Sequence, residues 1–299
     1  MNRVKVRVPA TTANIGPGFD CLGCALSLYA RFECEKTGAG LTITGCPEQY
    51  RNEDNLFVRA YRYTERMIGA EAAPLKVHIE TDVPVSRGLG SSATLLAGGA
   101  MAANALNGMP LSREEIAAIC STLEGHPDNT SPAVFGGMCV SFMKDGAPCT
   151  ERISVAKNVG FVALIPNFET RTEDMRAALP PQVSRADAVF NISRIAVLLR
   201  AFERGDMERI SIALEDRIHE PYRRPLIHEF NRAETAAKQA GCPSFCISGS
   251  GSTLLGIADA GSMAEIVPGI QRALKDSPYD WKILPLTIDL EGALVQKGA

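Results

Sequence analysis

The segment Pro84–Ala93, which reads PVSRGLGSSA, constrains the fold of this chain more than any other segment. It follows Leu75–Thr81, whose alternating apolar residues predict a β-strand. It precedes Thr94–Leu106, whose alanine and leucine content predicts an α-helix. The chain is therefore expected to run from a strand through a glycine-rich loop into the start of a helix.

The residues of this loop indicate an anion site. Gly88 and Gly90 permit a left-handed backbone and leave no Cβ between the main chain and a ligand. Ser91 and Ser92 stand where the N-cap of the following helix is expected, with free backbone N–H groups around them. Such a site attracts phosphate, whereas the alternative is an ordinary turn capped by serine. The loop has neither the lysine of a Walker A motif nor the spacing of a dinucleotide fingerprint.

The composition argues against several classes of partner. The 299 residues are 45% hydrophobic and 22% charged, which suits one large or two medium globular domains. The net charge is −3 without a block of like charge, so neither nucleic acid nor a membrane surface is an expected partner. The N-terminal residues do not form an apolar signal segment, and the longest weakly polar run is too short to cross a bilayer, so we expect a cytoplasmic protein. The nine scattered cysteines suggest reduced core residues; the less favoured alternative is a zinc site built from Cys21, Cys24, Cys242 and Cys246.

Strand-like and helix-like segments alternate irregularly along the chain. This pattern favours an α+β fold with antiparallel sheets over a doubly wound parallel sheet. A turn at Lys144–Pro148 suggests a boundary between two domains, residues 1–150 and 151–299. For the second domain the pattern predicts helices over 184–204, 206–216 and 224–240, and a last strand over 281–290.

Two further polar loops, Asn14–Asp20 and Ser248–Ser252, follow predicted strands and are candidates to line a site; the alternative is that both are plain turns. Glu124 ends a predicted apolar helix, where the helix dipole disfavours a carboxylate. A bound cation would offset that cost, and Mg²⁺ needs only one or two protein oxygens, which Ser92 and Glu124 would supply. The alternative is a solvated surface glutamate.

Arginines adjoin polar turns in the second half of the chain, and a guanidinium can hold a carboxylate through two parallel hydrogen bonds. Arg176 and Arg223 also lie close to prolines that fix the local backbone, which makes them the preferred candidates. For most such arginines the alternative is a solvated surface position. The arginines in question are Arg171, Arg176, Arg217, Arg223 and Arg224.

The order of four motifs resembles that of the GHMP small-molecule kinases. The motifs are PATTANIGPGFDCLGCAL, PVSRGLGSSA, EGHPDN and SGSGST, and the similarity extends to TEDMRAALP and EDRIHEPYRRPLI. The first motif is closer to the branch of this family that phosphorylates homoserine than to the mevalonate or galactose branches. Together the motifs cover most of the chain.

The resemblance implies an enzyme, an ATP-dependent phosphotransferase that phosphorylates the side-chain hydroxyl of L-homoserine in threonine biosynthesis. It implies an N-terminal domain like domain 2 of ribosomal protein S5 and a ferredoxin-like C-terminal domain, and the family often forms homodimers. Mg²⁺ would be held by Ser92 and Glu124. The loop residues that would bind ATP are Pro84, Arg87, Gly88, Leu89, Gly90, Ser91, Ser92 and Ala93.

The resemblance also implies how homoserine is held. Asp20 would meet the ammonium group, and Arg176 and Arg223 would clamp the carboxylate. Thr172 would lie near the reacting hydroxyl. The residues that would contact the substrate are Asn14, Asp20, Asn129, Arg176, Arg223, Gly249 and Gly251.

The sequence leaves open which residue, if any, acts as the general base and which substrate the protein phosphorylates. Asp128 is close to the place where some GHMP kinases have a catalytic aspartate, but Asn129 could occupy that place, and an amide cannot serve as a base; direct transfer without a strong base is favoured. Another GHMP kinase, acting on threonine, shikimate or an isoprenoid precursor, is the first alternative function. A non-catalytic nucleotide-binding protein of the same fold is the second.

Overall fold

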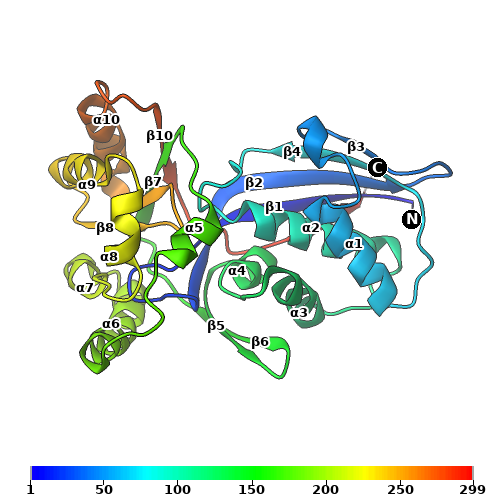
Figure 1. Ribbon diagram of the computed structural model, residues 1–299, viewed down its shortest axis with the longest axis horizontal. Helices are drawn as coiled ribbons and strands as arrows, with labels where there is room; N and C mark the ends of the chain where they lie inside the picture. Colours follow the sequence, from blue (N-terminus) through cyan, green and yellow to red (C-terminus); the bar gives the residue numbers. More distant parts are fainter. Residues whose placement is uncertain (1, 298–299) are drawn as a thin grey trace.

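The computed structural model describes residues 2–297 and contains two β-sheets, each with its own helices (Figure 1). The first sheet has the order β11-β1-β2-β4-β3, and β5 and β6 extend it from β2. All its pairings are antiparallel except the parallel pair β3 and β4. Its strands are β1 (Arg3–Ala13), β2 (Leu22–Lys36), β3 (Thr42–Thr44), β4 (Leu75–Thr81), β5 (Met138–Lys144), β6 (Ala147–Ile153) and β11 (Leu294–Lys297).

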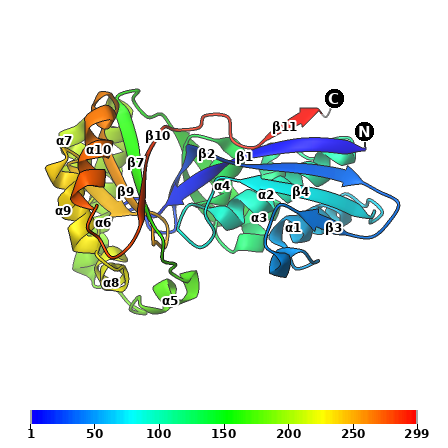
Figure 2. The ribbon, with the colours of Figure 1, turned by 90° about the horizontal axis from the view of Figure 1, so that it is seen from above.

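Four helices cover one face of the first sheet (Figures 1 and 2). They are α1 (Leu56–Met67), α2 (Ser91–Leu106), α3 (Arg113–Glu124) and α4 (Thr130–Phe135). Helix α2 is apolar around almost its whole circumference, and its residues from Ala93 to Leu106 are nearly all buried. A helix of this kind is stable only in the centre of a core, so the glycine loop that starts it is anchored to the buried core of the domain.

The second sheet is antiparallel with the order β10-β7-β9-β8. Its central strand β7 is buried on both faces: Val162 and Leu164 pack with helices α9 and α10, whereas Phe161 and Ala163 pack with α6 and α7 and join the core of the first domain. The elements are β7 (Val159–Pro166), α5 (Thr172–Ala177), α6 (Arg185–Arg204), α7 (Met207–Ala213), α8 (Glu220–Arg223), α9 (Phe230–Gln239), β8 (Ser244–Ile247), β9 (Leu254–Asp259), α10 (Met263–Ala273) and β10 (Trp281–Leu286).

The expected α+β class with antiparallel sheets is confirmed, but two predicted elements are wrong. Residues 224–229 do not begin an α-helix: Arg224–Leu226 form a 3₁₀ turn that contains Pro225, and Glu229 has a left-handed φ of 55° just before α9 begins. The last predicted strand ends at Leu286 rather than at residue 290. The chain there leaves the second sheet, because the carbonyl of Thr287 accepts a hydrogen bond from the backbone N–H of Ser27 on β2.

The predicted domain division at residue 150 stays a prediction, and two structural facts bear on it. The turn at Asp145–Gly146 is present, but it closes the hairpin of β5 and β6, so the first sheet continues to Ile153. Strand β11 then brings the end of the described chain back beside β1 in the first sheet (Figure 2). Among residues 2–297, none of the helices is long and apolar enough to cross a membrane.

Candidate active site

The glycine loop leads directly into helix α2, as predicted, but the cap of the helix differs from the expectation. Gly90 is the N-cap with a left-handed φ of 66°, and Ser91 and Ser92 are the first helical residues rather than the cap. A Cβ on Gly90 would lie 1.9 Å from Oγ1 of Thr11, so this position tolerates only glycine. The helix therefore starts without a side-chain cap, and its first backbone N–H groups face the space in front of the loop.

The three polar loops of the sequence meet at this point. The hydroxyl of Ser248 donates to the carbonyl of Gly88 at 2.6 Å, and the backbone N–H of Gly249 donates to the carbonyl of Ala13 at 2.9 Å. Arg87 donates from Nε to the carbonyl of Pro166 at 3.1 Å, which ties the glycine loop to the second domain. The site is thus built where the two domains join.

Ser92 and Glu124 lie side by side although they come from different helices. The Ser92 hydroxyl donates to Oε1 of Glu124 at 2.5 Å. Glu124 is the last residue of α3 and half-buried, and burial raises the pKa of its carboxyl group. The alternative of a solvated surface glutamate is therefore wrong. The pair offers two hard oxygen donors, the Ser92 hydroxyl and the partly desolvated carboxylate of Glu124. Such oxygens suit Mg²⁺ as the bound ion.

The EGHPDN segment places a second carboxylate nearby. Asp128 is 1% exposed; its Oδ1 lies 2.5 Å from Nδ1 of His126 and accepts a hydrogen bond of 2.9 Å from the backbone N–H of Asn129. The hydrogen bond to Asp128 raises the pKa of His126. The side-chain oxygen of Asn129 accepts a 2.7 Å hydrogen bond from Thr11. Oδ1 of Asp128 is thus engaged within its own loop, and Asn129 stands beside the glycine loop.

The charged residues predicted to bind a substrate are brought together from both domains. Asp20, in the loop after β1, pairs with Arg176 of α5 through two hydrogen bonds of 2.9 Å each. The Asn14 side chain accepts a hydrogen bond from the backbone N–H of Asp20 at 2.8 Å and donates to the carbonyl of Gly249 at 3.0 Å. Thr172, at the start of α5, lies 3.1 Å from Ser250 between their hydroxyl oxygens.

Arg223 differs from the other arginines because it is 1% exposed and none of the described carboxylates forms an ion pair with it. Its guanidinium donates to the carbonyls of Met175 and Gly249 at 3.3 and 3.2 Å. Burial, followed by the nearby charge of Arg176, lowers its pKa. A buried cation without a counter-ion is costly, so the site favours an anionic group at this position.

One cavity of about 420 Å³ joins these groups. Its lining contains most of the predicted site residues: Asn14, Asp20, Arg87, Gly88, Gly90, Ser91, Ser92, Glu124, Asp128, Asn129, Thr172, Arg176, Arg223 and Gly249. Four predicted residues lie outside the lining, namely Pro84, Leu89, Ala93 and Gly251; Leu89 and Ala93 are core residues beneath the loop. An apolar part of the lining comes from Ala30, Phe32, Leu56, Ile79, Val85 and Leu95.

Sequence reasoning missed three residues that build this site: Thr11, His126 and His219. Thr11 and His126 contact Asn129 and Asp128, and Nε2 of His219 lies 2.9 Å from the carbonyl of Gly16. Each of them lies inside a segment that carries the family resemblance, and membership in these segments is the signal that could have identified them. Thr11 and His219 contact residues 118 and 203 positions away, and local spacing carries no signal for such contacts, whereas His126 and Asp128 are neighbours within EGHPDN.

Comparisons with known proteins identify the family of this chain. The family model described as the GHMP kinases N terminal domain matches residues 55–137, and that described as GHMP kinases C terminal matches residues 198–276. The chain belongs to the GHMP kinases. Within this class it falls in the homoserine kinase family, because its full-length relatives carry that name.

Two of these relatives are clostridial. The homoserine kinase of Clostridium botulinum (strain Alaska E43 / Type E3) is 36% identical over 99% of both chains. That of Clostridium beijerinckii is 38% identical, again over 99% of both chains. The crystal structure of homoserine kinase from Cytophaga hutchinsonii has a TM-score of 0.89 at 25% identity and aligns over 99% of this chain and 98% of that one.

Proposed function

We propose that this protein transfers the terminal phosphoryl group of ATP to the side-chain hydroxyl of L-homoserine, giving O-phospho-L-homoserine and ADP. One observation carries the proposal: a single cavity holds the glycine loop together with the opposite charges of Asp20 and Arg223. The first feature suits a triphosphate, and the second suits a small zwitterion. The name shared by the full-length relatives supports the same substrate.

The nucleotide would occupy the part of the cavity between the apolar lining and helix α2. The N–H groups of the first turn of α2 face this space, and the positive end of the helix dipole favours the phosphates. Ser92 and Glu124 would hold Mg²⁺, which supplies charge neutralisation for the transferring phosphoryl group when it is bound. Apolar residues such as Phe32 and Ile79 offer the desolvated surface that an adenine ring requires.

The substrate would be held at both of its charged ends, with Asp20 at the ammonium group and Arg176 and Arg223 at the carboxylate. Phosphoryl transfer depends mainly on position and electrostatics, and two fixed ends orient the hydroxyl group toward the loop. Asp128 is engaged by His126 and by the backbone of Asn129. We therefore favour transfer without a strong general base.

A coupled assay of ADP release tests this function directly. The purified protein is given ATP and Mg²⁺ with L-homoserine, L-threonine, shikimate or mevalonate, and the product is identified by phosphorus NMR. The expected result is rapid turnover of L-homoserine with phosphate on the side-chain oxygen. A preference for another alcohol would indicate a different GHMP kinase, and ATP binding without ADP release on any substrate would indicate a non-catalytic protein.

Three broader statements are part of the same proposal. A role in threonine biosynthesis follows from the substrate, a cytoplasmic location suits a biosynthetic kinase of this kind, and a homodimer is the assembly expected for the family. Each rests on the resemblance and on the names of the relatives.

A further inference from the structure

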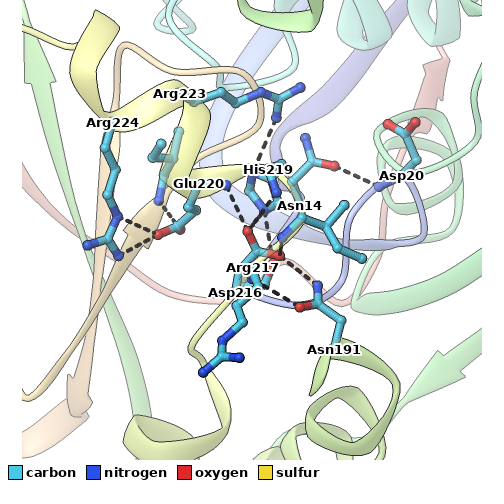
Figure 3. A network of polar contacts seen from close by, with 12 residues as sticks. Asn14, Asp20, Asn191, Asp216, Arg217, His219, Glu220, Arg223 and Arg224 are labelled. Carbon is cyan, nitrogen blue, oxygen red and sulfur yellow. Dashed lines mark hydrogen bonds and ion pairs between the residues drawn. The ribbon is translucent and has the colours of Figure 1, made fainter. Parts of the chain in front are cut away.

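His219 is fully buried at the start of α8 and touches both halves of the substrate site (Figure 3). Its Nε2 lies 2.9 Å from the carbonyl oxygen of Gly16, in the loop that carries Asp20. Its Nδ1 lies 3.4 Å from the guanidinium of Arg223. A carbonyl can only accept and a guanidinium can only donate, so these partners require a neutral ring with its proton on Nε2.

The surroundings of the ring fix its orientation. The buried carboxylate of Asp216 accepts hydrogen bonds from the backbone N–H groups of His219 and Glu220 at 2.8 and 2.7 Å, and from the Asn191 amide at 2.6 Å (Figure 3). The nearer carboxylate oxygen of Asp216 is 3.7 Å from Nε2, so it faces the same side of the ring as Gly16. Phe19 stacks on the imidazole ring, with ring centroids 5.2 Å apart. The imidazole therefore has little freedom to turn.

The loop Asn14–Asp20 of the first domain also packs directly against the backbone of the second domain. A Cβ on Gly16 would lie 2.3 Å from the carbonyl oxygen of Leu214, so the two backbones are in direct contact. Within the loop, Asn14 accepts the backbone N–H of Asp20. A shift of the loop at Gly16 would therefore carry Asp20 with it.

We propose that His219 is a positioning residue that sets the separation between Asp20 and Arg223, and thereby the fit of a zwitterionic substrate. The proposal rests on the proposed function for its substrate. An α-amino acid has a fixed distance between its ammonium and carboxylate groups, so the site needs a fixed distance between their partners. His219 provides it, because one ring nitrogen holds the loop of Asp20 and the other contacts Arg223. The proposed nucleotide contacts lie at the start of α2, and His219 is not among the residues that line the cavity.

Three substitutions of His219 separate the two contacts. His219→Phe keeps the stacking with Phe19 and removes both polar contacts. His219→Gln places an amide N–H near the position of Nε2 and keeps the contact with Gly16, whereas His219→Asn places an amide oxygen near Nδ1 and keeps the contact with Arg223. The matched control is His228→Phe, because His228 is an exposed histidine of the same domain that stacks on Tyr279.

The expected result is a graded loss that is specific to the amino acid. His219→Phe should raise the KM for L-homoserine at least about tenfold with the KM for ATP within about twofold of wild type, and the Gln and Asn variants should fall between wild type and Phe. His228→Phe should leave both constants unchanged. The proposal is overturned by an unchanged KM for homoserine in the Phe variant, by an equal rise in both KM values, or by Gln and Asn variants as impaired as Phe.

Amide hydrogen exchange gives a second readout that needs no substrate. The N–H of Asp20 is protected by Asn14, so in His219→Phe the amides of Gly16, Gly18, Phe19 and Asp20 should exchange faster than in wild type, with those of α2 unchanged. Equal exchange in the two proteins would refute the positioning role. If wild type fails to phosphorylate homoserine, the proposed function falls, and the exchange result still decides whether His219 positions the loop.

Discussion

The carboxylate of Asp20 accepts two parallel hydrogen bonds from the guanidinium of Arg176, each 2.9 Å long, across the cavity between the two domains. The Arg176 side chain is 46% exposed, so solvent weakens this ion pair. A ligand that binds between the two residues must separate them. A zwitterion compensates both charges at once, whereas a ligand with a single charge leaves one of them without a partner.

This relationship predicts non-additive losses for substrate analogues. 4-Hydroxybutyrate lacks the ammonium group of homoserine, 3-aminopropan-1-ol lacks the carboxylate, and propan-1-ol lacks both. Each singly charged analogue should lose about a hundredfold or more in kcat/KM, and propan-1-ol should be little worse than either. The measurement is kcat/KM for all four alcohols, and losses that simply multiply would contradict the coupling of Asp20 and Arg176.

Glu124→Gln should lower kcat by about a hundredfold or more, because the amide keeps the shape of the side chain and removes the charge that Mg²⁺ requires. The ligand-free variant should also unfold at a higher temperature at neutral pH. Burial raises the pKa of Glu124 in the folded state, so ionisation costs stability above the unfolded pKa, and the neutral amide avoids that cost.

The matched control for this variant is Glu114→Gln, an exposed glutamate in the first turn of the same helix. Turnover and melting temperature are measured for both variants from acidic to neutral pH. Near wild-type turnover of Glu124→Gln in saturating Mg²⁺ would refute the metal assignment. An unchanged melting temperature would refute the stability argument separately.

Ser92→Ala should weaken the use of Mg·ATP more than the binding of Mg-free ATP, because the hydroxyl stands beside Glu124 and does not cap α2. Isothermal titration of ATP with Mg²⁺ and with EDTA, together with KM for Mg·ATP, measures the difference. Ser193→Ala on the exposed surface of α6 serves as the control. Equal losses with and without the metal would show that Ser92 contributes to the loop only.

Gly90→Val should abolish nucleotide binding. The left-handed φ of 66° disfavours a β-branched residue, and the new side chain would collide with Thr11. ATP affinity is measured on protein whose fold has been verified by circular dichroism. Retained affinity in a folded sample would remove the glycine loop from the nucleotide site.

Arg223→Lys should raise the KM for homoserine much more than the KM for ATP. Lysine keeps the charge but not the planar fork, and losing one charge-assisted hydrogen bond costs about 1.5–3 kcal/mol, or roughly ten- to a hundredfold in kcat/KM. Arg224→Lys is the control, because Arg224 follows directly in the chain but pairs with Glu220 outside the cavity lining. If both variants behave alike, the carboxylate clamp is wrong.

Local patterns predicted those parts of the fold that local forces decide. Strand β4 (Leu75–Thr81) has the predicted bounds, because the alternation of apolar residues is visible within the segment itself. The final strand β11 was missed, since its four residues, Leu294–Lys297, are defined by pairing with β1 at the opposite end of the chain. The start of α9 was placed too early because Pro225 and the left-handed Glu229 interrupt the helical pattern.

The candidate site was predictable only as a set of separate loops. The order of the glycine, serine and acidic residues predicted an anion site at the loop around Gly90. It also predicted the oxygens of Ser92 and Glu124 as candidate ligands of Mg²⁺. The ion pair of Asp20 with Arg176 joins residues 156 positions apart, and spacing holds no information on such a contact. Whether a polar side chain is buried, as His219 is, depends on the packing of two domains and cannot be read from its neighbours in sequence.

The pairing of β11 with β1 also orders events during synthesis of the protein. Residues 3–153 contain every other strand of the first sheet, but β1 has an open outer edge until Leu294–Lys297 have left the ribosome. An unpaired strand edge is a template for association with other chains. An isolated N-terminal half should therefore be prone to aggregation, and protection of the nascent β1 edge by a chaperone should matter until these four residues have left the ribosome.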